Sequence, residues 1–262
     1  MNEITSQSNG KLKELTLLCR DRSERDLQGL CILDGLKLCR DAVENGSKIL
    51  QLWISESSTE KYREALETVI AASEEVYVVS DSAAKKLSET VSPQGVIALL
   101  KRPLDTDLYE LASSDRILGL CGVQNPENIG AAIRSAAAFG FSGIMISRDC
   151  ADPWSPRSVR AGAGTQLNCM IYTSHDFAGD VRKLGEEGFR TLASALHRDS
   201  VPLIDEKTTG KIFLAVGSEG SGLPEEVIEA CSETVYIPLS EGVESLNAAA
   251  AAAVMMWELR KK

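Results

Sequence analysis

The sequence predicts an α/β protein with a mostly parallel sheet in its C-terminal part. Three apolar runs in this part each end in a polar turn and continue into a helix-like segment. They read LGLCGVQNPENIGAAIRSAAAFG, LAVGSEGSGLPEE and VYIPLSEGVESLNAAAAAAVMMWE. Ligands of open α/β sheets bind just past the carboxyl ends of the strands. Three such turns in one domain therefore indicate a composite site.

Length and element order predict two domains. The chain has 262 residues, 44% of them hydrophobic, which is enough to bury a sizeable core. A polar, acidic stretch around Pro103 separates two series of elements, so we expect domains at 1–104 and 105–262. In the first domain, strands are expected at 29–33, 49–54, 76–79 and 96–100, with helices at 35–44, 58–72 and 82–87.

The second domain shows the same alternation of strands and helices. Strands are expected at 117–123, 143–147, 168–172, 190–195, 212–216 and 235–239. This order predicts parallel strands with helices on both faces of the sheet. The alanine run at 248–253 continues into 254–259 and predicts a helix with a close-packing face, because alanine is the best helix former.

Charge and cysteine content exclude several classes of protein. The net charge of −10 argues against an indiscriminate nucleic-acid binder, so any nucleic-acid contact must use local basic patches. The seven cysteines form no C-x-x-C pair and the chain has two histidines, so we expect no metal site and reduced thiols. There is no long apolar run and no apolar leader at the start, which predicts a soluble, cytoplasmic protein outside membranes.

Two motifs have both a structural and a functional reading. Asn125 and Pro126 are typical of a helix start, and this explains the first motif except for Arg134, a charge on an otherwise small, apolar helix. The turn Gly217-Ser218-Glu219-Gly220-Ser221-Gly222 lacks the Gly-Lys-Ser/Thr ending of a phosphate-binding loop and is not G-x-S-x-G. It is a loop whose backbone can approach a ligand closely. Glu219 either accepts hydrogen bonds from the amides of this loop or has a functional role in the site.

Two further segments leave the same choice open. Ser245 or Asn247 could cap the alanine-rich helix, and capping explains either residue without catalysis. The segment SPRSVRAGAGTQ, with Arg157 and Arg160, is either an exposed helix end or an anion-binding site.

Together, in this order and spacing, the motifs resemble the SpoU family of RNA ribose 2′-O-methyltransferases, within the SPOUT superfamily. The similarity runs from about Ile117 to Glu258 and rests on NPENIGAAIRSAAAFG, DPWSPRSVRAGAG, LAVGSEGSGLPEEV and IPLSEGVESLNAAAAAA. The upstream part resembles the small ribosomal-protein-like RNA-binding domain of that family, through LDGLKLCRDAVENG and LSETVSPQGVIALL. The resemblance implies an α/β trefoil knot in the C-terminal domain, preceded by a smaller α/β RNA-binding domain.

The resemblance also implies the reaction and its site. S-adenosylmethionine would donate a methyl group to a ribose 2′-hydroxyl of RNA, with ribosomal RNA favoured over transfer RNA, in a homodimer formed through the knotted domain. The catalytic and substrate-positioning residues would be Asn128, Arg134, Glu219, Ser245 and Asn247. The cofactor-binding residues would be Gly217, Gly220, Ile237, Leu239 and Leu246.

Two acidic residues depart from the family pattern. Glu127 stands where relatives often carry a small residue, and Glu244 adds a negative charge beside Ser245. An alternative from another class is an RNA-binding ribosome-assembly factor with weak or absent methyltransferase activity. The complete set of family residues favours the enzyme.

Overall fold

The structure is a computed structural model that describes residues 2–4, 6, 8–196, 199–203, 209–243 and 245–260. The chain forms two compact units, Met1–Leu104 with Asp152–Leu167 and Asp105–Ala151 with Asn168–Lys262. The segment 152–167, which the sequence places in the second domain, thus packs with the first unit. No helix in the described ranges combines the length and apolarity needed to cross a membrane.

The first unit is built on a five-stranded mixed sheet with the strand order β1-β4-β3-β5-β2. β5 is antiparallel to β2 and β3, while the other pairs are parallel. The strands are β1 (Asn2–Ile4), β2 (Leu30–Asp34), β3 (Ile49–Ser55), β4 (Ser73–Val79) and β5 (Val96–Lys101). The helices are α1 (Gly10–Arg20), α2 (Arg22–Gln28), α3 (Leu36–Glu44), α4 (Glu56–Lys61), α5 (Arg63–Ala71), α6 (Asp81–Leu87) and α9 (Pro156–Ala161).

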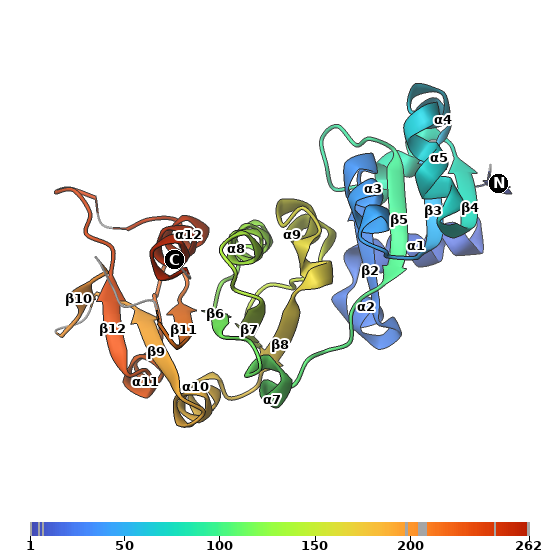
Figure 1. The fold of residues 1–262 in the computed structure, drawn as a ribbon. Helices are drawn as coiled ribbons and strands as arrows, with labels where there is room; N and C mark the ends of the chain where they lie inside the picture. The colour runs from blue at the N-terminus through green and yellow to red at the C-terminus, as the bar shows by residue number, and fades with distance from the viewer. Residues whose placement is uncertain are drawn as a thin grey trace. The chain divides into compact units, whose positions relative to one another are not determined.

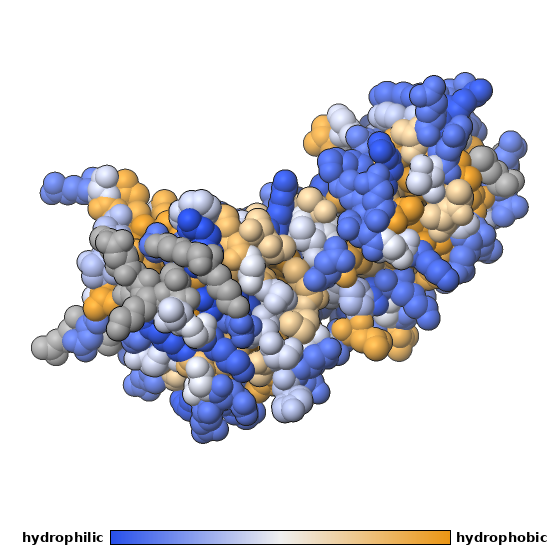
Figure 2. Space-filling view, viewed as in Figure 1, coloured by the Kyte–Doolittle hydropathy of each residue, from blue (hydrophilic) through white to orange (hydrophobic). Residues whose placement is uncertain are grey.

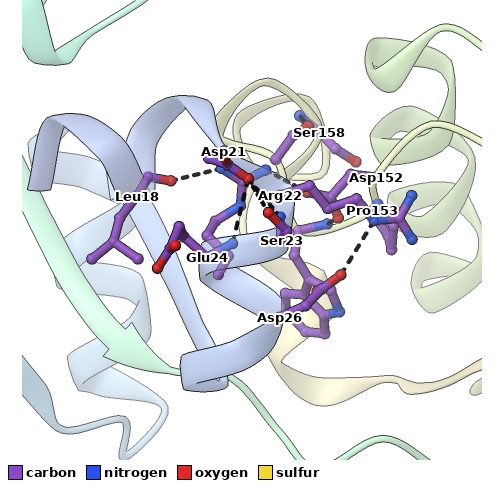
Figure 3. A network of polar contacts seen from close by, with 12 residues as sticks. Leu18, Asp21, Arg22, Ser23, Glu24, Asp26, Asp152, Pro153 and Ser158 are labelled. Carbon is purple, nitrogen blue, oxygen red and sulfur yellow. Dashed lines mark hydrogen bonds and ion pairs between the residues drawn. The ribbon is translucent and has the colours of Figure 1, made fainter. Parts of the chain in front are cut away.

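A buried ion pair holds the segment 152–167 in the first unit. The Arg25 guanidinium of α2 donates to Asp152 Oδ2 and to the Leu18 carbonyl, each at 2.6 Å. The Arg25 and Asp152 side chains are 4% and 9% exposed, so the pair is shielded from water. Asp21 accepts hydrogen bonds at the start of α2, and Leu18 and Asp152 lie on opposite sides of the network in Figure 3.

The second unit contains a seven-stranded sheet in which every recorded strand pair is parallel. Its strand order is β10-β12-β9-β11-β6-β7-β8, so β11 lies between β9 and β6. The strands are β6 (Arg116–Leu120), β7 (Gly143–Ser147), β8 (Met170–Ser174), β9 (Phe189–Ser194), β10 (Val201–Pro202), β11 (Lys211–Val216) and β12 (Glu233–Tyr236). The predicted α/β fold with a mostly parallel C-terminal sheet is confirmed, and the trefoil knot stays a prediction.

Helices cover both faces of this sheet (Figure 1). They are α7 (Leu108–Leu111), α8 (Pro126–Ala138), α10 (Phe177–Glu186), α11 (Glu225–Ala230) and α12 (Ala248–Leu259). α8 and α12 lie side by side on one face, and their small residues, such as Ala132 and Ala252, are buried. Arg116 at the start of β6 is also buried, and its guanidinium donates to the carbonyl of Leu259 at the end of α12.

Some sequence-based elements differ from those in the structure. α1 and α2 were not predicted, and the helix expected at 58–72 is two helices separated at Tyr62. The strand expected at 168–172 begins later, because residues 165–168 form a 3-10 turn. The strand expected at 235–239 ends at Tyr236, so Ile237 and Leu239 lie beyond it.

Candidate active site

The loop after β11 closes on itself, and only glycine fits at its first position. Ser218 and Gly222 form an isolated backbone bridge, and Gly222 has a φ of +68°. A Cβ placed on Gly217 would lie 2.2 Å from the Gly222 carbonyl carbon, a distance at which the backbone must move. The tight turn therefore depends on Gly217 and presents the next residues, including Glu219, past the end of the strand.

The N-terminus of α8 supplies the second part of the site. Asn125 Oδ1 accepts a hydrogen bond from the Glu127 amide at 2.9 Å, and Pro126 occupies the first helical turn, as the sequence predicts. This start turns Asn128 inward, where it is 8% exposed. Glu127 is exposed at the same helix end.

The N-terminus of α12 supplies the third part. Asn247 Oδ1 accepts hydrogen bonds from the amides of Ala249 and Ala250 at 3.0 and 3.3 Å, which is the capping role. Its amide nitrogen is left to donate elsewhere. Capping and a role in the site, which the sequence left as alternatives, therefore use different atoms of one side chain.

These three parts meet at one carboxylate oxygen. Glu219 Oε1 accepts hydrogen bonds from Asn128 Nδ2 at 2.8 Å, Asn247 Nδ2 at 2.5 Å and the Ala248 amide at 3.2 Å. Asn247 Nδ2 also donates to Asn128 Oδ1 at 3.0 Å. Hydrogen bonds to an ionised acceptor are stronger than neutral ones, so Glu219 fixes both asparagine side chains.

A cavity of about 590 Å³ opens beside this network at the carboxyl ends of β9, β11 and β12. Four of the predicted cofactor residues line it, namely Gly217, Ile237, Leu239 and Leu246. Gly220, the fifth, is not among the lining residues. Glu219 and Ser245 line it as well.

Sequence reasoning missed other residues that line the cavity. They include Ser194, Leu196, Ser218, Tyr236, Val243 and Met255. Ser218, Tyr236, Val243 and Met255 lie in the two segments that the sequence indicated as parts of a composite site, whereas Ser194 and Leu196 had only the end of the predicted strand at 190–195 as a signal. A volume in this range and walls of backbone, apolar side chains and a few polar groups are typical of a cofactor pocket. S-adenosylmethionine fits such a donor set, because its adenosine suits the apolar walls and its sulfonium suits the carboxylate edge.

Arg134 is not brought into the hydrogen-bond network of Asn128. It is exposed on α8, and its side chain makes no hydrogen bond or ion pair with the described residues. Six residues separate it from Asn128, so the two side chains point about 120° apart around the helix. Glu244 lies outside the described residues.

The thiols and carboxylates form no metal site within the described ranges, where no group of three His, Cys, Asp or Glu residues is placed to hold an ion. All seven cysteines are free. Burial raises the pKa of Cys121, near the end of β6, to about 11, so this thiol stays protonated at neutral pH.

Comparison with known proteins agrees with this geometry. Residues 115–257 match the SpoU rRNA Methylase family, and residues 9–98 match an MRM3-like substrate binding domain. An uncharacterized tRNA/rRNA methyltransferase of Synechocystis sp. is 32% identical, covering 99% of this chain and 93% of that protein. The 23S rRNA (guanosine(2553)-2′-O)-methyltransferase RlmP of Bacillus subtilis is 26% identical, covering 99% and 100% of the two chains.

Solved structures show the same similarity over both units. The AdoMet-bound rRNA methyltransferase from Sinorhizobium meliloti superimposes with a TM-score of 0.81 at 26% identity, covering 98% of this chain and 97% of that one. AdoMet is S-adenosylmethionine, the cofactor that the cavity fits.

Proposed function

Since the chain belongs to the SpoU rRNA methylase family and is an S-adenosylmethionine-dependent RNA 2′-O-methyltransferase, we propose that its substrate is a guanosine of ribosomal RNA. Ribosomal RNA is supported by the MRM3-like substrate binding domain, and guanosine by the name of RlmP, which matches the chain over its full length. The hydrogen-bond network of Asn128, Glu219 and Asn247 beside the cavity is the observation that carries the assignment.

The residues of the cavity suit a methyl transfer. When bound, S-adenosylmethionine would supply an activated methyl group, carried on a sulfonium, to the ribose oxygen, whose proton would pass to solvent. Gly217, Ile237, Leu239 and Leu246 would hold the cofactor through backbone and apolar contacts. A hydroxyl is a weak nucleophile, so it must be oriented, and the Asn128 amide, held by the cavity residue Glu219, would do this.

Arg134 has a supporting electrostatic role in this proposal. A guanidinium keeps its proton at neutral pH and is therefore a poor base. Arg134 would instead bind a phosphate of the RNA and stabilise the negative charge that develops on the ribose oxygen. Arg134 is exposed and has no hydrogen-bond or ion-pair partner among the described residues, which supports a guanidinium that is available to bind the substrate.

A homodimer formed through α8 and α12 is part of the proposal. Val254 and Trp257 on α12 are 47% and 51% exposed, which is unusual for large apolar side chains. Apolar surface also gathers over α8 in Figure 2. Pairing of this face would cover it, and would place Arg134 at or near the interface. The knotted path of the second unit and a cytoplasmic location belong to the same proposal, supported by the family and by rRNA as the substrate.

Mapping of ribose methylation tests the function. Total RNA from a deletion strain is compared with RNA from its parent, and one lost 2′-O-methylguanosine in ribosomal RNA is expected. Restoring the gene should restore the site, whereas a Glu219→Ala copy should not. An unchanged ribosomal RNA pattern with a lost site in transfer RNA would contradict the substrate. Calorimetry of the purified protein with S-adenosylmethionine tests the cofactor separately.

A further inference from the structure

The cavity and the site occupy one half of the carboxyl edge of the seven-stranded sheet. Residues that follow β9, β11 and β12 line the cavity, and Asn128 follows β6, the next strand across. Since the strands are parallel, the loop after β7 comes next along the same edge. A nucleotide whose ribose lies at Asn128 therefore has this loop, residues 148–151, as its neighbour on the side away from the cofactor.

Hydrogen bonds fix the loop after β7 to the loop after β6. The Gly122 amide donates to Ser147 Oγ at 2.9 Å, and the Ala151 amide donates to the Val123 carbonyl at 2.9 Å. The Gln124 side-chain amide donates to the Asp149 carbonyl. The two loops thus form one rigid edge that is continuous with the start of α8.

Asp149 presents one free carboxylate oxygen from this edge. Its Oδ1 accepts a hydrogen bond from Ser147 Oγ, which fixes the side chain. Its Oδ2 has no hydrogen-bond partner among the residues that the structure describes, and the residue is exposed. A Cβ on Gly122 would lie 3.5 Å from Asp149 Oδ2 and 4.0 Å from Ser218 Cβ, so Asp149 and Ser218, a residue that lines the cavity, both lie close to Gly122.

A fixed carboxylate at this place suits one base in particular. Carboxylates only accept hydrogen bonds, so they favour bases that present N–H donors. Guanine presents two adjacent donors, N1–H and the 2-amino group, on its Watson–Crick edge. Uracil, cytosine and adenine present only one donor group there. In single-stranded RNA loops this edge is free for protein contacts.

We propose that Asp149 selects the target base, by accepting hydrogen bonds from N1–H and the 2-amino group of guanine with its free Oδ2 and with the second lone pair of Oδ1. The inference rests on the proposed function and adds the residue that determines specificity. Arg148, exposed in the same loop, offers a positive charge for a flanking phosphate.

The test uses RNA fragments that contain the mapped site, with guanosine or inosine at the target position. Inosine lacks the 2-amino group and is otherwise guanosine. The wild-type protein should methylate guanosine about 10- to 100-fold more efficiently in kcat/KM than inosine. Asp149→Asn and Asp149→Ala should reduce this preference to about 3-fold or less, with unchanged affinity for S-adenosylmethionine. Glu187→Gln, an exposed change after α10, is the matched control and should keep the wild-type preference.

The ratio of kcat/KM for guanosine to kcat/KM for inosine distinguishes base recognition by Asp149 from a purely structural role of Asp149 in the loop. If the Asp149 variants lower both rates equally, or if the wild-type protein does not distinguish the two bases, the inference is wrong. A mapped target other than guanosine also overturns it, while RNA methylation itself would stand. If the wild-type protein binds the cofactor but methylates no RNA, the proposed function fails, and the inference fails with it.

Discussion

Asn128 and Glu219 are joined by a hydrogen bond of 2.8 Å across 91 residues of sequence. The Asn128 side chain is buried, and Glu219 Oε1 also accepts a hydrogen bond from Asn247. One oxygen thus orients two amides that come from different helices, and the cavity lies beside it. This relationship explains why the site needs residues from three separate segments, namely the loop after β11 and the starts of α8 and α12.

Removal of the shared acceptor should disrupt the site without unfolding the protein. In Glu219→Ala, both asparagine amides lose their common partner, and we expect the single-turnover methylation rate to fall about 100-fold. Glu219→Gln keeps an acceptor oxygen and should retain more activity. Rapid-quench assays at saturating cofactor and RNA give the rates, and thermal melting checks the fold. Equal rates for wild type and Glu219→Ala would show that the network does not position the reaction.

Substitution of Arg134 should affect the reaction and leave cofactor binding unchanged. The residue is exposed on α8 and does not line the cavity. Loss of its charge should slow methyl transfer about 100-fold in Arg134→Ala, with a smaller loss in Arg134→Lys, which keeps a point charge. Single-turnover assays are paired with calorimetry for S-adenosylmethionine. Unchanged rates in both variants would remove Arg134 from the mechanism.

Two glycines of one loop should respond differently to alanine. A Cβ on Gly217 would meet the backbone of Gly222 at 2.2 Å, whereas a Cβ on Gly220 would have no atom within 4 Å. We therefore expect Gly217→Ala to weaken the binding of S-adenosylmethionine about 5- to 150-fold, because a distortion of the loop that costs about 1–3 kcal/mol is needed. Gly220→Ala should bind normally. Calorimetry compares the two, and a strong defect in Gly220→Ala would show that Gly220 contacts the cofactor after all.

The apolar face of α12 should determine the oligomeric state. Trp257→Glu places a charge on a half-exposed ring, and we expect it to convert a dimer to monomers at micromolar concentration. Leu27→Glu changes a residue that is 82% exposed on α2 and serves as the control. Sedimentation velocity measures both. A monomeric wild-type protein would refute dimerisation outright.

Asp180 should make the second unit sensitive to acid. Burial raises the pKa of this carboxyl, but hydrogen bonds from Ser174, Lys183 and Tyr172 outweigh burial and lower it below its usual value. A lowered pKa in the folded state means that ionised Asp180 stabilises the fold above about pH 4, and that this contribution is lost as the pH falls further. Asp180→Asn should therefore be less stable than wild type at pH 7, and the difference should shrink below about pH 4. Urea unfolding at both pH values measures it.

Local patterns in the sequence predicted most of the second unit. The cap at Asn125, the alanine run and the short apolar strands depend on neighbouring residues, and α12 begins and ends where expected. The dual role of Asn247 could not be read from sequence, because its second partner, Glu219, is 28 residues away. The resemblance named both residues but not the bond between them.

Long-range contacts account for the larger differences between the sequence-based predictions and the structure. The segment 152–167 joins the first unit through the pair Arg25 and Asp152, which are 127 residues apart and match no local pattern. α2 buries only Arg25 along a polar sequence, so it has no apolar periodicity, whereas α1 buries Leu12, Leu15, Leu18 and Cys19 at helical spacing and could have been predicted. Arg134 remained a family assignment, because no contact with the residues that the structure describes reveals its role.

The position of β11 between β9 and β6 has a consequence for the making of the protein. During translation, the strands from β6 to β9 are synthesised before β11. Until β11 emerges, no strand pairs with both β6 and β9, so the two sides of the sheet are not joined. The loop that begins at Gly217 and the helix that begins after Asn247 arrive later still. A nascent or prematurely terminated chain therefore has no methyl-donor pocket, and activity is acquired in one late step of translation.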